Sequence, residues 1–153
     1  MTDLHTSDTL DALSFAIFRV HGALIAMGDR IGAPYGLTSA RWQVMGTVQL
    51  AGQPQTVAQI ARAMGLSRQA VQRVMNDLEV IGMIEMQDNP AHKRARLVVN
   101  SPAGLRAYEQ IMAEWARLSR SLMEALPAEK LEDSSATLDA LTRALLALGP
   151  PPD

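Results

Sequence analysis

The chain has 153 residues, 48% of them hydrophobic, which is enough for one domain with a buried core. It contains no cysteine, so a disulfide framework and a thiolate metal site are excluded. The net charge of −2 would by itself argue against a nucleic-acid-binding protein, but the charge is uneven: residues 56–106 carry seven basic and four acidic side chains, whereas the rest of the chain carries seven and twelve.

A long helix is predicted near the N-terminus, from an N-cap at Asp8 to about Gly32. Its apolar residues recur every three or four positions: Leu10, Leu13, Ile17, Val20, Leu24, Met27 and Ile31. At 1.5 Å per residue this helix is roughly 33 to 36 Å long, more than one small domain can cover. The segment lacks the pattern of a signal peptide and no membrane span is predicted, so we expect a cytoplasmic protein.

Two shorter helices follow. After a break near Pro34, Thr38 begins a helix that ends near Gly52. The next helix is predicted over residues 56–64, with Thr56 capping its first turn. Its apolar positions share one face: Val57, Ile60, Ala61 and Met64.

The turn 65–67 joins this helix to a longer one over residues 68–81. Gly65 suits the left-handed backbone that ends a helix, Leu66 is expected in the core, and Ser67 can cap the next helix. Apolar residues spaced 3, 4 and 3 form the buried stripe of that helix: Val71, Val74, Leu78 and Ile81. The opposite face turns polar side chains outward: Arg68, Gln69, Gln72, Arg73 and Asn76.

The outward face of the 68–81 helix has the side chains that recognise a DNA duplex. Arginine can hold guanine O6 and N7, glutamine or asparagine can hold adenine N6 and N7, and a helix fits the major groove. Acidic residues appear only at Asp77 and Glu79, near the helix end. The alternative is that this helix face only contacts solvent. The adjoining turn and the basic hairpin favour DNA contact instead. Arg73 stays ambiguous, because Asp77 at i+4 could engage it.

A basic hairpin is predicted after Gly82. Two half-buried strands have these inward positions: Ile84 and Met86 in the first, Leu97 and Val99 in the second. The link between them, residues 88–94, turns at Asn89 and Pro90. An ordinary charged hairpin is one interpretation, but a wing that contacts phosphates or a minor groove is favoured by three basic side chains: Lys93, Arg94 and Arg96.

Two further helices complete the chain. Ser101 caps the first, Pro102 takes its first position, and this helix ends before Pro127. The second begins at Ala128. Each carries an apolar stripe: Leu105, Tyr108, Ile111, Met112, Trp115, Leu118 and Leu122 on the first, and Leu131, Leu138, Leu141, Leu145 and Leu148 on the second. Together with the N-terminal helix they offer apolar surface that a partner subunit must cover.

The order and spacing of these motifs resemble the multiple-antibiotic-resistance regulator (MarR) family over nearly the whole chain. The resemblance is carried by five segments: residues 37–42, 56–61, 65–73, 78–84 and the wing at 89–95. It implies a homodimeric winged-helix DNA binder, usually a repressor and often released by a small phenolic or lipophilic ligand. Two departures stand out. The chain has His92-Lys93 where the family commonly places an acidic residue that orients the wing arginine, and Val99-Asn100-Ser101 where a Leu-Thr pair usually ends the second wing strand.

The predicted fold is therefore mainly α with a small β-hairpin wing, in one intertwined domain. Residues 1–37 form an N-terminal dimerisation helix, 38–101 the winged helix-turn-helix, and 102–153 the C-terminal dimerisation helices. The expected function is sequence-specific binding of a pseudo-palindromic operator in double-stranded DNA, with no enzyme activity, cofactor or metal. The predicted DNA contacts are Thr56, Ser67, Arg68, Gln69, Gln72, Arg73, Asn76, Lys93, Arg94 and Arg96. The alternative is a protein-binding module whose adaptable surface contains Met64, Met75 and Met83.

A small aromatic or lipophilic effector is expected between the first, second and fifth predicted helices. The candidate pocket residues are His21, Trp42, Met45, Met112 and Trp115. Apolar residues at helical spacing are more commonly core than ligand contacts. His21 has no second ligand at metal-binding spacing, so an exposed or hydrogen-bonded histidine is favoured over a metal ligand.

Overall fold

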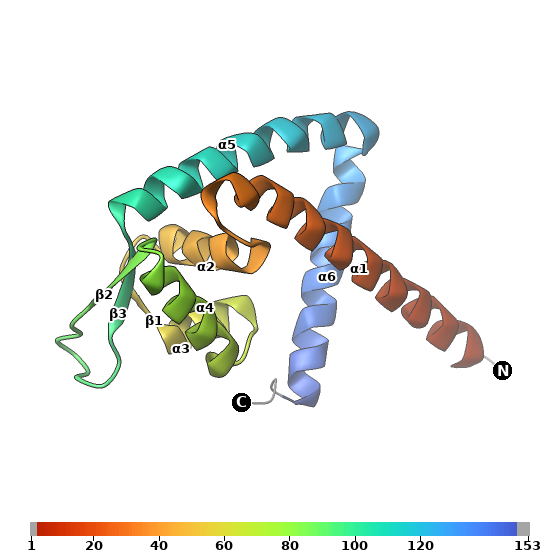
Figure 1. Cartoon of the computed structure of the whole chain (residues 1–153). Helices are drawn as coiled ribbons and strands as arrows, with labels where there is room; N and C mark the ends of the chain where they lie inside the picture. The colour runs from red at the N-terminus through yellow and green to blue at the C-terminus, as the bar shows by residue number, and fades with distance from the viewer. Residues whose placement is uncertain (1–2, 150–153) are drawn as a thin grey trace.

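The structure of the chain, a computed structural model, describes residues 3–149, and their side chains from residue 8 onward. Within that range it is mainly helical with a small antiparallel sheet, which confirms the predicted fold class (Figure 1). The elements are α1 (Asp3–Gly32), the 3₁₀ turn η1 (Ala33–Tyr35), α2 (Ser39–Leu50), β1 (Gln55–Thr56), α3 (Val57–Met64), α4 (Arg68–Val80), β2 (Ile84–Gln87), β3 (Leu97–Asn100), α5 (Pro102–Ala125) and α6 (Ala128–Leu148).

Four helices begin at hydroxyl side chains that cap their first turn, and three of these caps, at Thr56, Ser67 and Ser101, are predicted from the sequence. Each side-chain oxygen accepts a hydrogen bond from the backbone N–H three residues on, and the caps are Thr38, Thr56, Ser67 and Ser101. At Thr56 the cap is reciprocal, because the Gln59 side chain accepts from the Thr56 backbone N–H at 2.8 Å. Gly65, with φ of 64°, ends α3 in the left-handed conformation.

The sheet has three strands in the order β1-β3-β2, one more than the predicted hairpin. Gln55 pairs with Val98 in β3, so the short strand before α3 is joined to the wing. Val98 is fully buried, whereas Leu97 and Val99 are only partly buried. The predicted inward positions of β3 were therefore wrong by one residue, because a one-residue change of register exchanges the two faces of a strand.

The core lies between α2, α3, α4, the start of α5 and the sheet. Its fully enclosed large side chains are Val44, Met45, Ile60, Val71, Met75, Leu78, Val98 and Ile111. On α4 the buried positions include Met75, whereas Val74 is half-buried and Ile81 is exposed. Leu66 is also exposed, which corrects its predicted place in the core. Burial of Met75 removes it from the adaptable surface that a protein-binding module would use.

Helix α1 begins at Asp3, so Asp8 lies inside the helix and is not its cap. Its C-terminal end packs on the core through Ile31, whereas the rest extends away from it (Figure 1). From Asp8 to Tyr35 the chain is long and apolar enough to cross a membrane by length and composition alone, which corrects the expectation of no such stretch. Exposed apolar side chains on α1, such as Phe15 and Phe18, are also typical of a helix that a partner covers in an assembly.

Candidate DNA-binding surface

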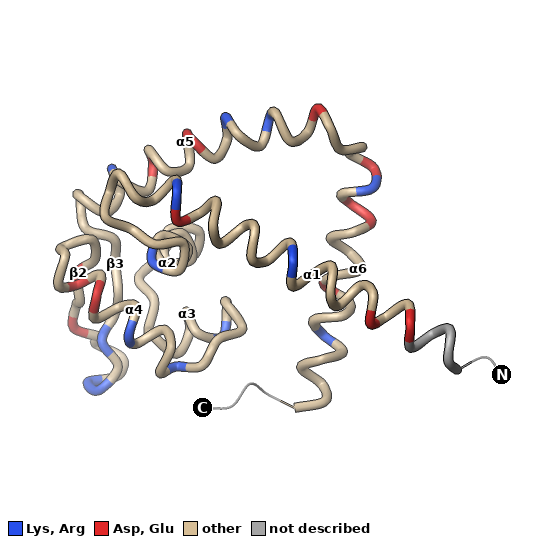
Figure 2. The backbone as a smooth tube through the Cα atoms, turned by 45° about the vertical axis from the view of Figure 1, so that its right-hand side comes forward, with Lys and Arg blue, Asp and Glu red and all other residues tan. Residues whose placement is uncertain are grey.

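The first turn of α3, the outward face of α4 and the wing surround one open groove. It is lined by seven of the predicted DNA contacts: Thr56, Arg68, Gln69, Gln72, Asn76, Arg94 and Arg96. These residues come from three separate parts of the sequence, and the β1–β3 pairing brings them together. Figure 2 shows lysine and arginine positions of α3, α4 and the wing along this same edge of the molecule. The groove therefore has a helix along one wall, and its charged lining residues are three arginines and one carboxylate, that of Glu79.

The other three predicted contacts lie outside the groove lining. The Ser67 hydroxyl accepts from the Ala70 backbone N–H at 3.2 Å, so its first role is to cap α4. Arg73 is exposed on α4, and Lys93 is exposed in the wing loop. Asp77 bonds to Arg41 at 3.1 Å, and not to Arg73, which removes the predicted i+4 competitor for that arginine.

Two amide side chains on α4 are linked to each other. Nε2 of Gln72 donates to Oδ1 of Asn76 at 2.8 Å, and both side chains are exposed on the groove side of the helix. The bond fixes the Gln72 side chain while its own oxygen and second N–H stay available. Those are the acceptor and donor that a bidentate contact to adenine requires. The pair can therefore present a preorganised base-recognition group to a major groove.

The wing loop is organised by Asn89. Its Nδ2 donates to the Ala95 carbonyl oxygen at 2.8 Å, and its Oδ1 accepts from the Ala91 backbone N–H at 3.0 Å. The backbone N–H of His92 also donates to the Asn89 carbonyl oxygen at 3.1 Å. The loop is thus closed by neutral hydrogen bonds in a segment with no acidic residue at positions 92 and 93. Arg94 projects from this closed loop into the groove lining.

Arg96 is engaged within the protein. Its Nη2 donates to the Met86 carbonyl oxygen at 2.7 Å, and its Nη1 lies 4.0 Å from Oε1 of Glu79 on α4. Arg96 therefore connects the wing to α4, in addition to lining the groove. The sequence did not predict this partner, because the pairing depends on a tertiary contact between the residue before β3 and the end of α4.

The predicted effector residues do not converge on one pocket. Met45 is fully enclosed in the core, and Nε1 of Trp42 donates to the Gly28 carbonyl oxygen at 3.0 Å. Trp42 and Met112 line a shallow hollow, whereas Trp115 packs against the core. His21 lies in a different cleft, between α1 and α6. These positions correct the single pocket predicted from the sequence.

A capped helix-turn-helix followed by a basic wing on a three-stranded sheet defines a winged-helix protein. A sequence profile described as the MarR family matches residues 35–95. An uncharacterized protein of Mycobacterium tuberculosis is 36% identical over 142 residues, 93% of this chain and 96% of the relative. The chain belongs to the MarR family.

Solved structures show the same fold. A MarR family transcription regulator gives a TM-score of 0.79 at 23% identity, with 94% of this chain and 95% of that chain covered. A mutant of MarR from E. coli complexed with operator DNA gives a TM-score of 0.73 at 24% identity, with 95% and 99% covered. The fold of this chain is that of the MarR transcription regulators.

Proposed function

We propose that the protein is a homodimeric transcription regulator, acting as a repressor, that binds a pseudo-palindromic operator in double-stranded DNA. The observation that carries the proposal is the groove in which the Gln72–Asn76 amide pair, Arg68 and Arg94 face the same space. A mutant of MarR from E. coli, which has the same fold, was solved in complex with operator DNA, and this supports DNA binding as the function. A protein-binding module is less favoured, because three arginines line the groove and Met75 is buried.

In this proposal α4 enters the major groove and the wing follows the adjoining backbone. The exposed amides and Arg68 contact base edges, which carry sequence information. Lys93 and Arg94 contact phosphates or the minor groove, which adds affinity with little sequence dependence. Ser67 and Thr56 contribute mainly through the helix N-termini that they cap, where backbone N–H groups suit a phosphate.

The homodimer is inferred from apolar surface that one chain leaves exposed. On α1, Phe15 and Phe18 are 64% and 69% exposed, and on α6 Leu145 is 57% exposed. A twofold interface between two copies would cover these helices and place two α4 helices about one turn of DNA apart, or about 10 base pairs. Release from DNA by a small aromatic or lipophilic effector is part of the proposal.

The first test concerns base recognition by Gln72. Selection from a randomised duplex library gives the preferred sequence, and Gln72→Ala is expected to lower affinity for it by about 1 to 3 kcal/mol while binding to random duplex stays nearly unchanged. The matched control is Gln49→Ala, because Gln49 is exposed on α2 outside the groove. An equal loss of affinity on selected and random duplexes would contradict base recognition by Gln72.

The second test concerns the wing. Arg94→Ala is expected to weaken binding to every duplex and to reduce the slope of log K against log salt by about one, since one phosphate contact is lost. Arg143→Ala removes the same charge from α6 and serves as the control. Titrations at several salt concentrations measure both slopes. If the slope of Arg94→Ala equals that of the control, Arg94 does not contact a phosphate.

A further inference from the structure

The carboxylate in the lining of the DNA-binding groove is unexpected on a surface that is proposed to meet phosphates. Glu79 lies there together with Arg68, Arg94 and Arg96. It follows Asn76 by three residues, so it shares the groove face of α4 with the amide pair. Its side chain is 49% exposed. Because carboxylate and phosphate are both negative, Glu79 opposes the DNA binding that the arginines favour.

The stability of α4 does not account for this carboxylate. Glu79 lies in the last turn of α4, which ends at Val80. The carbonyl groups of a last turn give the helix end a partial negative charge, so an acidic side chain there is unfavourable. The positive charge nearest to Glu79 comes from outside the helix, from Arg96 just before β3. The role of Glu79 is therefore to be found in its relation to Arg96.

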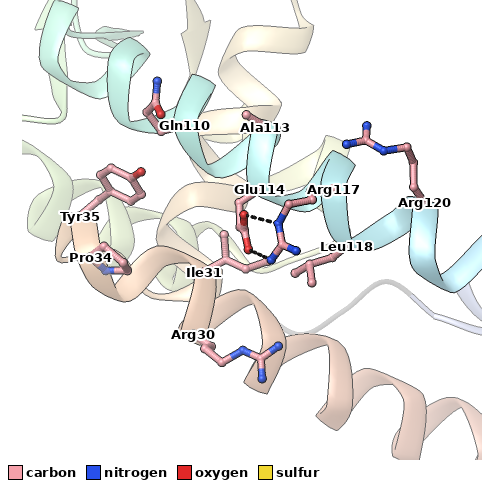
Figure 3. Close-up of a pocket in the computed structure, with 10 residues that line it drawn as sticks. All are labelled: Arg30, Ile31, Pro34, Tyr35, Gln110, Ala113, Glu114, Arg117, Leu118 and Arg120. Carbon is pink, nitrogen blue, oxygen red and sulfur yellow. Dashed lines mark hydrogen bonds and ion pairs between the residues drawn. The ribbon is translucent and has the colours of Figure 1, made fainter.

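Arg96 is held by two contacts of unequal strength. Its Nη2 donates to the Met86 carbonyl oxygen at 2.7 Å, whereas its Nη1 stands 4.0 Å from Oε1 of Glu79, beyond hydrogen-bond distance. A tight pair has another geometry: Figure 3 shows Arg117 donating two hydrogen bonds to Glu114, at 2.6 Å and 3.0 Å. The attraction between Glu79 and Arg96 is thus one of charge alone, and a DNA phosphate can compete with it.

We propose that Glu79 is a specificity-determining residue, whose carboxylate keeps Arg96 within the protein and so limits the phosphate binding that does not depend on sequence. This inference rests on the proposed function, because it concerns the same groove. Arg96, predicted from the sequence to contact DNA, is then a positioning residue that connects the wing to α4. With a neutral residue at position 79, Nη1 of Arg96 is free to donate to a phosphate while Nη2 stays bonded to Met86.

Restraint of Arg96 acts more strongly on random DNA than on an operator. Binding to random DNA is electrostatic, and the protein can shift along the duplex until each free arginine meets a phosphate. On an operator the base contacts of Gln72 and Asn76 fix α4, so a freed Arg96 must find a phosphate from that one position. Loss of the Glu79 charge therefore strengthens random binding more than operator binding, and the ratio of the two affinities falls.

Titrations of a random duplex at several salt concentrations test the competition for Arg96. Glu79→Gln is expected to raise the affinity about fivefold and to increase the magnitude of the slope of log K against log salt by about one, since one more phosphate contact forms. Glu85→Gln makes the same charge change at an exposed position of β2 outside the groove lining, and should alter the slope little. Equal slopes for the two variants overturn the competition.

Substitution of Arg96 identifies the side chain that makes the new contact. Arg96→Gln alone should weaken binding, because Glu79 loses its counter-charge, but should leave the slope near its wild-type value. Added to Glu79→Gln, the same substitution should return the increased slope to the wild-type value, because the gained phosphate contact is removed. If Arg96→Gln alone reduces the slope by about one, Arg96 already binds a phosphate and the proposal is wrong.

Comparison of the selected duplex with random duplex tests the role in specificity. Glu79→Gln should raise the affinity for the selected duplex by about twofold or less, so its discrimination falls, whereas Glu79→Asp keeps the charge and should keep the wild-type ratio. Equal gains on both duplexes overturn the role in specificity. If the wild-type protein binds duplex and all variants behave alike, this inference alone fails. If the wild-type protein binds no duplex, the proposed function fails and this inference with it.

Discussion

Replacing Gly104 with alanine is expected to lower the free energy of unfolding by about 1 to 3 kcal/mol. Gly104 lies in the first turn of α5, where an added Cβ would collide with the backbone carbonyl of Met83 and approach Cε of Met45 at 3.3 Å. The backbone cannot easily retreat, because Ser101 donates to the Gly82 carbonyl oxygen at 2.7 Å and accepts from the Gly104 N–H at 3.0 Å. Urea unfolding measures the effect.

Gly22→Ala is the matched control for this substitution. Gly22 lies within α1 and no atom approaches an added Cβ within 4 Å. Alanine is the better helix former by about 1 kcal/mol, so this change should be neutral or stabilising. If Gly104→Ala unfolds at the same urea concentration as the wild-type protein, then the first turn of α5 does not pack closely on the Met83 backbone in solution.

The second large effect is expected on assembly. Phe18→Ala should raise the dissociation constant of the proposed homodimer about 100-fold or more. Burial of a phenylalanine contributes about 1.5 to 3 kcal/mol, and a twofold interface loses the contact in both copies. Analytical ultracentrifugation over a concentration series measures the shift from dimer to monomer.

Leu50→Ala is the control for assembly, because Leu50 is 84% exposed but lies at the end of α2. It should leave the dimer intact. A wild-type protein that sediments as a folded monomer at micromolar concentration would refute the dimer. Insertion of α1 into a membrane, which its length and hydropathy allow, predicts instead that the protein sediments with lipid vesicles.

The sequence predicted best the features that depend on a few neighbouring residues. The caps at Thr56, Ser67 and Ser101 need only a hydroxyl and the N–H three residues later, so they were predicted without any tertiary information. The turn at Gly65 is equally local. These signals set the helix boundaries, and the order of the helices then indicated the winged helix.

Features that depend on distant contacts were missed or misplaced. The strand β1 has two residues, too few to show alternation, and exists because it pairs with β3. In β3 three consecutive apolar residues make either face plausible, and packing selects Val98. On α4, Val74 and Met75 are both apolar, so only the direction of the core decides that Met75 is enclosed.

The candidate site also contains both kinds of feature, those set by neighbouring residues and those set by distant contacts. The outward residues of α4 follow from helical periodicity, and the structure places Gln72 and Asn76 beside the wing residue Arg94 as one surface. The links of Arg41 to Asp77 and of Arg96 to Glu79 join elements far apart in sequence and have no local signal.

The pairing of β1 with β3 also limits how an operator can be released. Because Gln55 and Thr56 are hydrogen-bonded to the wing strand, the start of α3 and the wing cannot separate without breaking the sheet. In the proposed homodimer the wing and the helix pair would then tilt together as one unit, and a switch would act on the distance between the two units. The protein should therefore bind weakly to a DNA whose half-sites are a few base pairs further apart, because the wing cannot bend to reach them.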